Sequence, residues 1–125
     1  MSDSVLIVDD EQAFRRHATR LLRMRGFRIV GEAGDGAEAM RVARELEPGA
    51  VLLDVNLPDR SGLDVARELA TLPRSPRVLL TSADAEVSSE DLRACGAMAF
   101  VAKDLLPTSD LGTLLGQQGR PGGPA

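Results

Sequence analysis

Four short aliphatic runs in this chain each end on polar side chains that could take part in one reaction. In chain order, the side chains that follow the runs are Asp9 and Asp10, Asp54, Thr81 and Ser82, and Lys103. Aliphatic runs of about four residues between turn-forming residues are typical of strands buried on both faces, as in parallel sheets. Ligands of such sheets bind at the carboxyl ends of the strands, so these groups should converge on one crevice. Together they predict a metal-assisted phosphoryl site.

Lys103 is the only lysine among the 15 basic residues, and the others are all arginine. Lysine carries a compact point charge with freely turning donors, whereas arginine is a planar fork, so the two are not interchangeable at a tight site. The position of Lys103 at a strand end therefore indicates a function. The alternative is that Lys103 has no function and is a lysine by chance in a sequence that otherwise uses arginine.

The segments that must position these groups alternate between strand-like and helix-like patterns, which predicts an α/β fold with helices on both faces of a sheet. The predicted strands cover residues 5–8, 28–33, 50–54, 78–80 and 99–102. A first helix should follow Asp10 and stop before Gly26, because apolar residues recur at helical spacing between them. A second should begin at a capping box formed by Asp35 and Glu38 and end before Pro48.

Three further helices are expected after the third, fourth and fifth strands. Ser88 or Ser89 should cap the fourth helix, and Thr108 or Ser109 should cap the last one. Two glycines in the last helix each cost about 1 kcal/mol relative to alanine. This helix is therefore predicted to be short or frayed.

The bulk composition is that of one globular domain. The chain has 125 residues, 43% of them apolar and 27% charged, with no Trp or Tyr and three Phe. We predict a folded domain over residues 1–118 and a disordered Gly/Pro-rich tail, or the start of a linker, over 119–125. Few aromatics and a net charge of −4 argue against binding to nucleic acid or to anionic lipid.

The single cysteine, Cys95, excludes an internal disulfide and a multi-cysteine zinc site, and it fits a reducing compartment. The sequence contains no apolar stretch near the roughly 18 residues of a membrane span and no signal-peptide pattern. The cytoplasm is the expected location.

Taken in order, these motifs resemble the receiver domain of bacterial two-component response regulators over about residues 5–115. The motif residues are the Asp9–Asp10 pair, Asp54-x-x-Leu57-Pro58-Asp59-x-x-Gly62, Thr81, and Lys103 with Phe100 three residues before it. The resemblance implies a flavodoxin-like, doubly wound, five-stranded parallel sheet of strand order 2-1-3-4-5.

The resemblance also implies the chemistry. Asp54 would be the phosphoacceptor, a carboxylate nucleophile that forms an acyl phosphate. Mg²⁺, or Mn²⁺, would be held by Asp9, Asp10, Asp54 and the backbone carbonyl of Asn56. Lys103 would pair with Asp54 before the reaction and with a phosphoryl oxygen after it.

A switch is implied as well. The Thr81 hydroxyl would move to donate to the phosphoryl group, and the small Ser82 would leave room for access. Phe100 would then turn inward, and its lack of a hydroxyl should make that state less costly. The signal would be read on the face formed by the fourth helix, the fifth strand and the fifth helix.

The implied partners are a sensor histidine kinase or phosphotransfer protein and a downstream protein target or missing output domain. The chain would be a monomer or a phosphorylation-linked dimer. Lys103 is followed by Asp104 where many receivers have proline, a pattern that resembles receivers placed before helix-turn-helix output domains.

Two rival functions remain open. An aspartyl-nucleophile phosphatase would need a general acid two residues after Asp54, and Asn56 cannot do acid work, so a turnover enzyme is not expected. A receiver-like module could instead bind proteins without phosphate. Because neither Asn56 nor Ala83, two residues beyond Thr81, supplies an acid or base, hydrolysis of the phosphoryl group should not be fast.

Structural roles are the alternatives at several positions. Asp9 could cap the first helix, and Asp59 should shape its loop with Pro58 rather than bind metal. His17 should be a packed or solvated helix residue rather than a phosphoacceptor. The arginines at positions 15–25 should form a solvated helix face, or they could dock an acidic partner.

Overall fold

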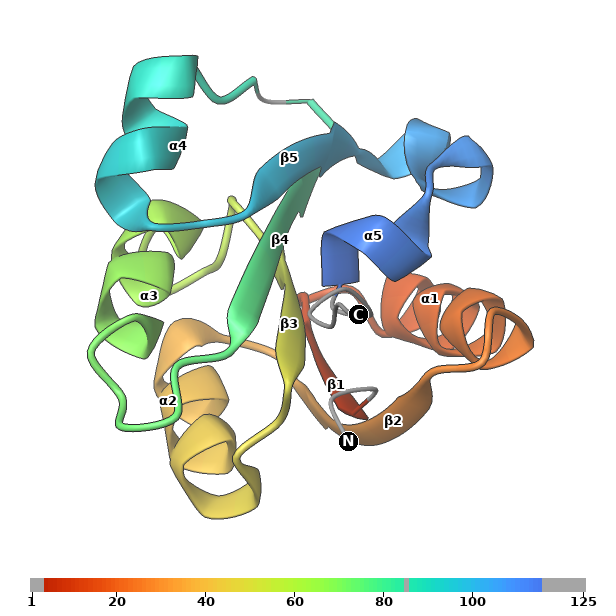
Figure 1. Ribbon diagram of the computed structural model, residues 1–125, viewed down its shortest axis with the longest axis horizontal. Helices are drawn as coiled ribbons and strands as arrows, with labels where there is room; N and C mark the ends of the chain where they lie inside the picture. The colour runs from red at the N-terminus through yellow and green to blue at the C-terminus, as the bar shows by residue number, and fades with distance from the viewer. Residues whose placement is uncertain (1–3, 85, 116–125) are drawn as a thin grey trace, which may run out of the picture.

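The computed structural model describes residues 4–84 and 86–115. A five-stranded parallel sheet of order β2-β1-β3-β4-β5 forms its centre (Figure 1). The strands are β1 (Ser4–Val8), β2 (Arg28–Ala33), β3 (Ala50–Asp54), β4 (Arg77–Ser82) and β5 (Ala99–Ala102). The predicted fold class and strand order are confirmed, and the aliphatic runs that predicted β1 and β3 are interior strands of the sheet.

Helices cover both faces of this sheet. They are α1 (Gln12–Met24), α2 (Gly36–Leu46), α3 (Gly62–Leu69), α4 (Ser89–Cys95) and α5 (Leu111–Leu115), with a 3-10 helix, η1, at Lys103–Thr108. Figure 1 shows α1 and α5 on one side of the sheet and α2, α3 and α4 on the other. Each side has its own hydrophobic core, and β1 and β3 are buried on both faces. Among the described residues, no helix is long and apolar enough to cross a bilayer.

Local signals explain where two of these helices begin. Asp35 Oδ1 accepts the Glu38 N–H at 2.8 Å, as the capping prediction requires, while Glu38 Oε1 accepts the N–H of Gly34 rather than that of Asp35. Ser88 Oγ accepts the Asp91 N–H at 3.0 Å, so the predicted cap of α4 is confirmed at Ser88.

The predicted cap of the last helix is wrong. Asp110 Oδ1 accepts the Thr113 N–H at 3.3 Å, whereas the hydroxyls of Thr108 and Ser109 donate back to the Leu105 carbonyl at 3.1 and 2.7 Å. The η1 turn ahead of α5 uses both hydroxyls and moves the start of the helix beyond them. The predicted tail at 119–125 lies outside the described residues.

Candidate functional site

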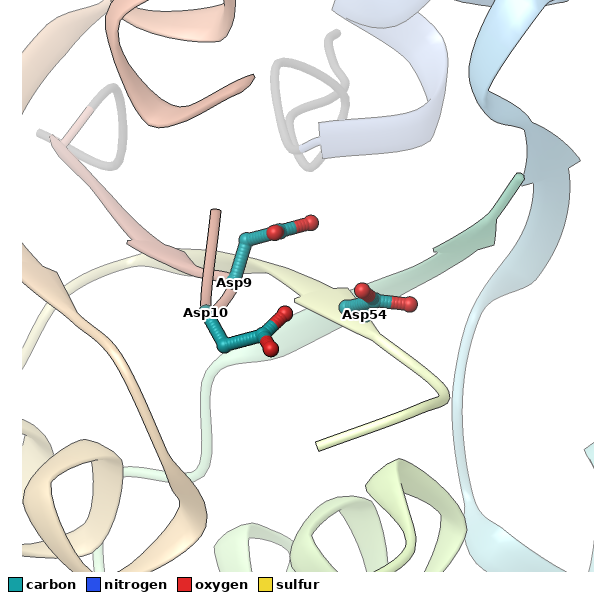
Figure 2. Close-up of side chains that lie close together, drawn as sticks. All are labelled: Asp9, Asp10 and Asp54. Carbon is teal, nitrogen blue, oxygen red and sulfur yellow. The ribbon is translucent and has the colours of Figure 1, made fainter. Parts of the chain in front are cut away.

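Three carboxylates meet where β1 and β3 end. Asp9 and Asp10 follow β1 and Asp54 closes β3, and one oxygen from each lies within 4.8 Å of the others (Figure 2). Asp9 is fully buried and Asp54 nearly so, whereas Asp10 is exposed. Carboxylate oxygens are the hard ligands that Mg²⁺ prefers, and an exposed member leaves room for the waters that Mg²⁺ keeps. The donor set therefore fits a magnesium ion.

Asp54 lies in surroundings that disfavour its charge. Burial raises the pKa of Asp54 to about 6, and the neighbouring charge of Asp9 adds to the rise. The N–H of Asn56, 3.1 Å from Asp54 Oδ1, and the charge of Lys103 act in the opposite direction. A carboxylate that is costly to ionise in this position gains from any cation bound beside it.

Lys103 reaches into the acidic group from the end of β5. Its Nζ lies 2.7 Å from Asp9 Oδ2, 3.5 Å from Asp54 Oδ2 and 3.6 Å from Glu11 Oε1. Burial opposes the charge on Lys103, but its contact with Asp9 and the charges of all three acids outweigh burial and raise its pKa. The ring of Phe14 lies beneath the ammonium, 4.2 Å from ring centroid to Nζ, which also favours the cation.

The backbone just ahead of α1 is fixed by Asp9 itself. Asp9 Oδ1 accepts the Glu11 N–H at 2.8 Å, and the Asp9 carbonyl accepts from Arg15 Nη1 at 2.6 Å. Glu11 is the N-cap residue of α1, and its side chain makes no capping hydrogen bond in the described structure. The alternative role of Asp9 as a helix cap is therefore wrong, because its side chain turns the chain before the helix starts.

The loop after Asp54 is closed very tightly. The Gly62 N–H donates to the Val55 carbonyl at 2.7 Å, and Asn56 bridges to Ser61. A Cβ on Gly62 would overlap the Asp54 carbonyl oxygen and lie 2.8 Å from Val55 Cα, so only glycine allows this approach. This closure holds Asn56 beside the carboxylates.

The two hydroxyls that end β4 have different surroundings. Thr81 is fully buried and donates to the Val101 carbonyl at 2.6 Å. Ser82 Oγ instead accepts from Asn56 Nδ2 at 3.2 Å, and an oxygen of Asp84 lies 3.3 Å from it. Ser82 is thus the hydroxyl that hydrogen-bonds Asn56, while Thr81 stands opposite Asp54 in the register of β3 and β4.

Phe100 shares a sheet face with Ser82. The register of β4 and β5 pairs Leu80 with Phe100 and Thr81 with Val101. Because side chains alternate along a strand, Ser82 lies on the face of Leu80 and Phe100, and Thr81 lies with Val101 on the other. The two cores agree: Leu80 and Phe100 belong to the side of α2, α3 and α4, and Val101 to the side of α1 and α5.

Two acids at the site, Glu11 and Asp84, were not singled out from the sequence. The mouth of the crevice is lined by Asp10, Glu11, Asp54, Asn56, Ala83, Asp84 and Lys103. Asp84 Oδ1 accepts from Asn56 Nδ2 at 3.1 Å. It lies two residues beyond Ser82, whose hydroxyl accepts from the same Asn56 Nδ2.

The helix-face residues lie apart from this chemistry. His17 is exposed on α1. Arg15 pairs with Glu32 at 2.9 Å, and Arg25 donates to backbone carbonyls at and after the end of η1, so these two are not simply solvated. Three other α1 arginines form no ion pair within the described residues: Arg16, Arg20 and Arg23.

The parallel sheet of this strand order, with paired acids after β1, an acid ending β3 and a lysine after β5, has the arrangement expected from the resemblance to receiver domains. The model of the response regulator receiver domain matches residues 5–113, and the chain belongs to that family. Receiver domains bind Mg²⁺ at an acidic pocket and generally act as signalling switches rather than as turnover enzymes.

Individual relatives agree with this assignment. The transcriptional regulatory protein PdtaR of Mycobacterium tuberculosis is 41% identical over 112 residues, which cover 86% of this chain and 55% of PdtaR. The chemotaxis protein CheY of Thermotoga maritima is 30% identical over 110 residues, covering 86% of this chain and 91% of CheY. The chain thus spans about half the length of PdtaR (55%) and nearly all of this CheY (91%).

A solved structure extends the likeness to three dimensions. The CheX-CheY-BeF3-Mg+2 complex from Borrelia burgdorferi has a chain that superposes with a TM-score of 0.73 at 27% identity. The match covers 79% of this chain and 76% of that one.

Proposed function

We propose that this domain accepts a phosphoryl group on Asp54 from a sensor histidine kinase or phosphotransfer protein, with Mg²⁺ or Mn²⁺ bound, and works in the cytoplasm. The observation that carries the proposal is the convergence of Asp9, Asp10 and Asp54 within 4.8 Å, with the Lys103 ammonium against two of them. Asp9, Asp10, Asp54 and the Asn56 carbonyl would hold the metal. When bound, it neutralises negative charge between the carboxylates and the incoming phosphoryl group.

Asp54 is the nucleophile in this proposal. One of its carboxylate oxygens attacks the phosphorus of a phosphohistidine, a P–O bond forms and the P–N bond breaks. The imidazole nitrogen leaves with the electron pair and takes up a proton. Lys103, 3.5 Å from Asp54 Oδ2, is close enough to donate to a phosphoryl oxygen after a small movement away from Asp9.

The output should depend on Ser82 and Phe100. Phosphorylation adds roughly two negative charges and three acceptor oxygens. Of the two hydroxyls predicted to contact the phosphoryl group, Thr81 and Ser82, we propose that Ser82 is the one that shifts. The Thr81 hydroxyl donates to the Val101 carbonyl, although Thr81 stands opposite Asp54 in the register of β3 and β4. A shift of Ser82 would be felt by Phe100 on the same face. The α4, β5 and α5 surface would then control a protein target or an output domain, in a monomer or a phosphorylation-linked dimer.

The solved Borrelia burgdorferi complex supports this chemistry. It contains BeF3 and Mg²⁺ with a CheY chain, and BeF3 on a carboxylate stands in for an acyl phosphate. The same ligand should bind this domain at Asp54.

The test is intact mass after incubation with acetyl phosphate or phosphoramidate, with and without Mg²⁺, on the unmutated chain and on Asp54→Asn. One phosphoryl group that appears only with Mg²⁺ and only on the unmutated chain is the expected result. No adduct on folded protein, beside a working control receiver, would contradict the proposal and favour a phosphate-independent binding module.

The switch assignment has its own matched pair of variants. Ser82→Ala should weaken the change in the NMR resonances of β5 that BeF3 and Mg²⁺ produce. Thr81→Val keeps the buried volume and removes only the hydroxyl, so it should leave that change largely intact. The reverse ranking would return the role to Thr81.

A further inference from the structure

We propose that Asp59 is a positioning residue for the metal site: it fastens the loop of residues 55–61, which carries Asn56, to the amino terminus of α2. The inference rests on the proposed function, because it assigns the Asn56 carbonyl to the metal. Asp59 itself would not touch the ion.

The fastening consists of two hydrogen bonds across a large sequence distance. Asp59 Oδ1 accepts the Gly36 N–H at 2.8 Å, and Oδ2 accepts the Ala37 N–H at 3.0 Å. These are donors that an α-helix leaves unpaired in its first turn, where the helix dipole also favours a negative charge. The hydrogen bond from Gly36 lowers the pKa of Asp59, which favours the charged carboxylate as the acceptor of these two N–H groups.

The neighbouring residue makes the contact close as well as polar. A Cβ on Gly36 would lie 2.7 Å from Cγ of Arg60 and 3.0 Å from a methyl group of Val65, so Arg60 packs directly on the glycine. Arg60 Nη1 then pairs with Glu68 Oε1 at 2.7 Å on α3. The outer part of the loop is thereby held between α2 and α3.

Helix α2 does not depend on Asp59 alone. Asp35 Oδ1 already accepts the Glu38 N–H at 2.8 Å, and the Asp35 carbonyl accepts the Ala39 N–H. Without Asp59, the helix keeps a cap of its own, whereas the loop loses its two hydrogen bonds to another element. The main consequence of removing Asp59 should therefore appear in the loop.

The loop matters because Mg²⁺ demands near-ideal octahedral geometry from its ligands. Gly62 fixes the closing end of the loop against the Asp54 carbonyl, and Asp59 fixes its outer part. Along the chain, Asn56 lies between Val55, whose carbonyl accepts the Gly62 N–H, and Asp59. Partners that orient a metal ligand typically change metal affinity by about 10- to 100-fold when removed.

The experiment is calorimetric titration of the folded, unphosphorylated chain with MgCl₂, repeated with Mn²⁺ by water-proton relaxation. Asp59→Ala should weaken Mg²⁺ binding about tenfold. Asp59→Asn keeps one acceptor oxygen and should lose less. If the two variants lose affinity equally, the lost charge alone is responsible and the proposal is overturned.

Asp35→Ala is the matched control, since it removes the other side-chain cap of the same helix terminus and the same charge. It should lower the melting temperature through loss of the cap, yet bind Mg²⁺ nearly as well as the unmutated chain. If Asp59→Ala only lowers the melting temperature, or Asp35→Ala weakens Mg²⁺ binding as much, Asp59 is a helix cap and no more. Failure of the unmutated chain to bind Mg²⁺ would instead remove the proposed function itself.

Discussion

Lys103 Nζ lies 2.7 Å from Asp9 Oδ2 and 3.5 Å from Asp54 Oδ2, so the lysine predicted to pair with Asp54 is held more closely by Asp9. Asp9 is fully buried, and an unpaired carboxylate there would be very costly. The ammonium of Lys103 consequently stabilises the charged form of Asp54 only in part, which agrees with the raised pKa of Asp54. The two carboxylates thus share one cation unequally.

In metal-free buffer, ionisation of Asp54 should cost stability. Its pKa is raised from 3.8 to about 6, chiefly by burial, so between these values the folded state binds more protons than the unfolded state. Stability from this group is then fully present below pH 3.8 and is lost as the pH rises through about 6.

Asp54→Asn isolates that effect from the other titrating groups. The difference in unfolding free energy between this variant and the unmutated chain should grow in favour of the variant from about pH 4 to 7, by on the order of 2 kcal/mol, and then level off. Urea unfolding at several pH values measures it. A difference that stays constant across this range would contradict the raised pKa.

Removing Lys103 should expose its role in neutralising Asp9. Lys103→Met leaves a buried carboxylate without its partner, which should lower the unfolding free energy by roughly 3 kcal/mol. In the double variant with Asp9→Asn, much of that loss should disappear, with a coupling of about 1–3 kcal/mol. The exposed pair of Arg67 and Asp64, treated in the same way, should couple by less than about 1 kcal/mol. Equal coupling energies for the two pairs would contradict the burial argument.

Asp84 should slow phosphoryl transfer from anionic donors. Its carboxylate lines the crevice mouth, bonded to Asn56, and repels an incoming phosphate. Asp84→Asn should raise the initial rate of labelling by acetyl phosphate a few-fold. The repulsion between one charge and an anionic donor in water-exposed surroundings is on the order of 1 kcal/mol. Intact mass against time measures the rate, and Asp91→Asn on α4 serves as the control. An unchanged rate, or an equal rise in the control, would refute a local effect of Asp84.

Gly62→Ala should be far more damaging than Gly34→Ala. The new methyl group at position 62 would overlap the Asp54 carbonyl oxygen, whereas at position 34 the nearest atom is 3.7 Å away. We expect a loss of at least about 3 kcal/mol for Gly62→Ala and a change within about 1 kcal/mol for Gly34→Ala, measured by urea unfolding. Comparable losses would mean that the loop can open without cost.

The strands and the acidic group could be predicted from the sequence because both follow from local patterns. A run such as that of β3 has no exposed position and then meets Asp54, and a central parallel strand accommodates both features. The sheet face on which each β4 hydroxyl lies could not be predicted in this way. Assigning Ser82 rather than Thr81 to the face of Phe100 requires the register between β4 and β5, which no local pattern records.

Asp59 and the last helix show the same limit. The sequence placed Asp59 in the loop with Pro58, but its partners on α2 come from a backbone 22 to 23 residues away. Thr108 and Ser109 have the right chemistry for a cap, yet the preceding η1 turn engages both hydroxyls before α5 starts. Local hydrogen bonds of these hydroxyls to the backbone thus compete with capping of α5.

The contact between Lys103 and Asp9 joins the first strand of the sheet to the segment that follows the last one. A partly folded chain in which β1 and β3 have paired, but β5 has not yet docked, would hold Asp9 and Asp54 together without the ammonium. Repulsion between carboxylates in such a poorly solvated place raises the energy of that intermediate. The charge balance of the site should therefore make folding more cooperative, because Lys103 neutralises the buried carboxylates only after β5 has docked.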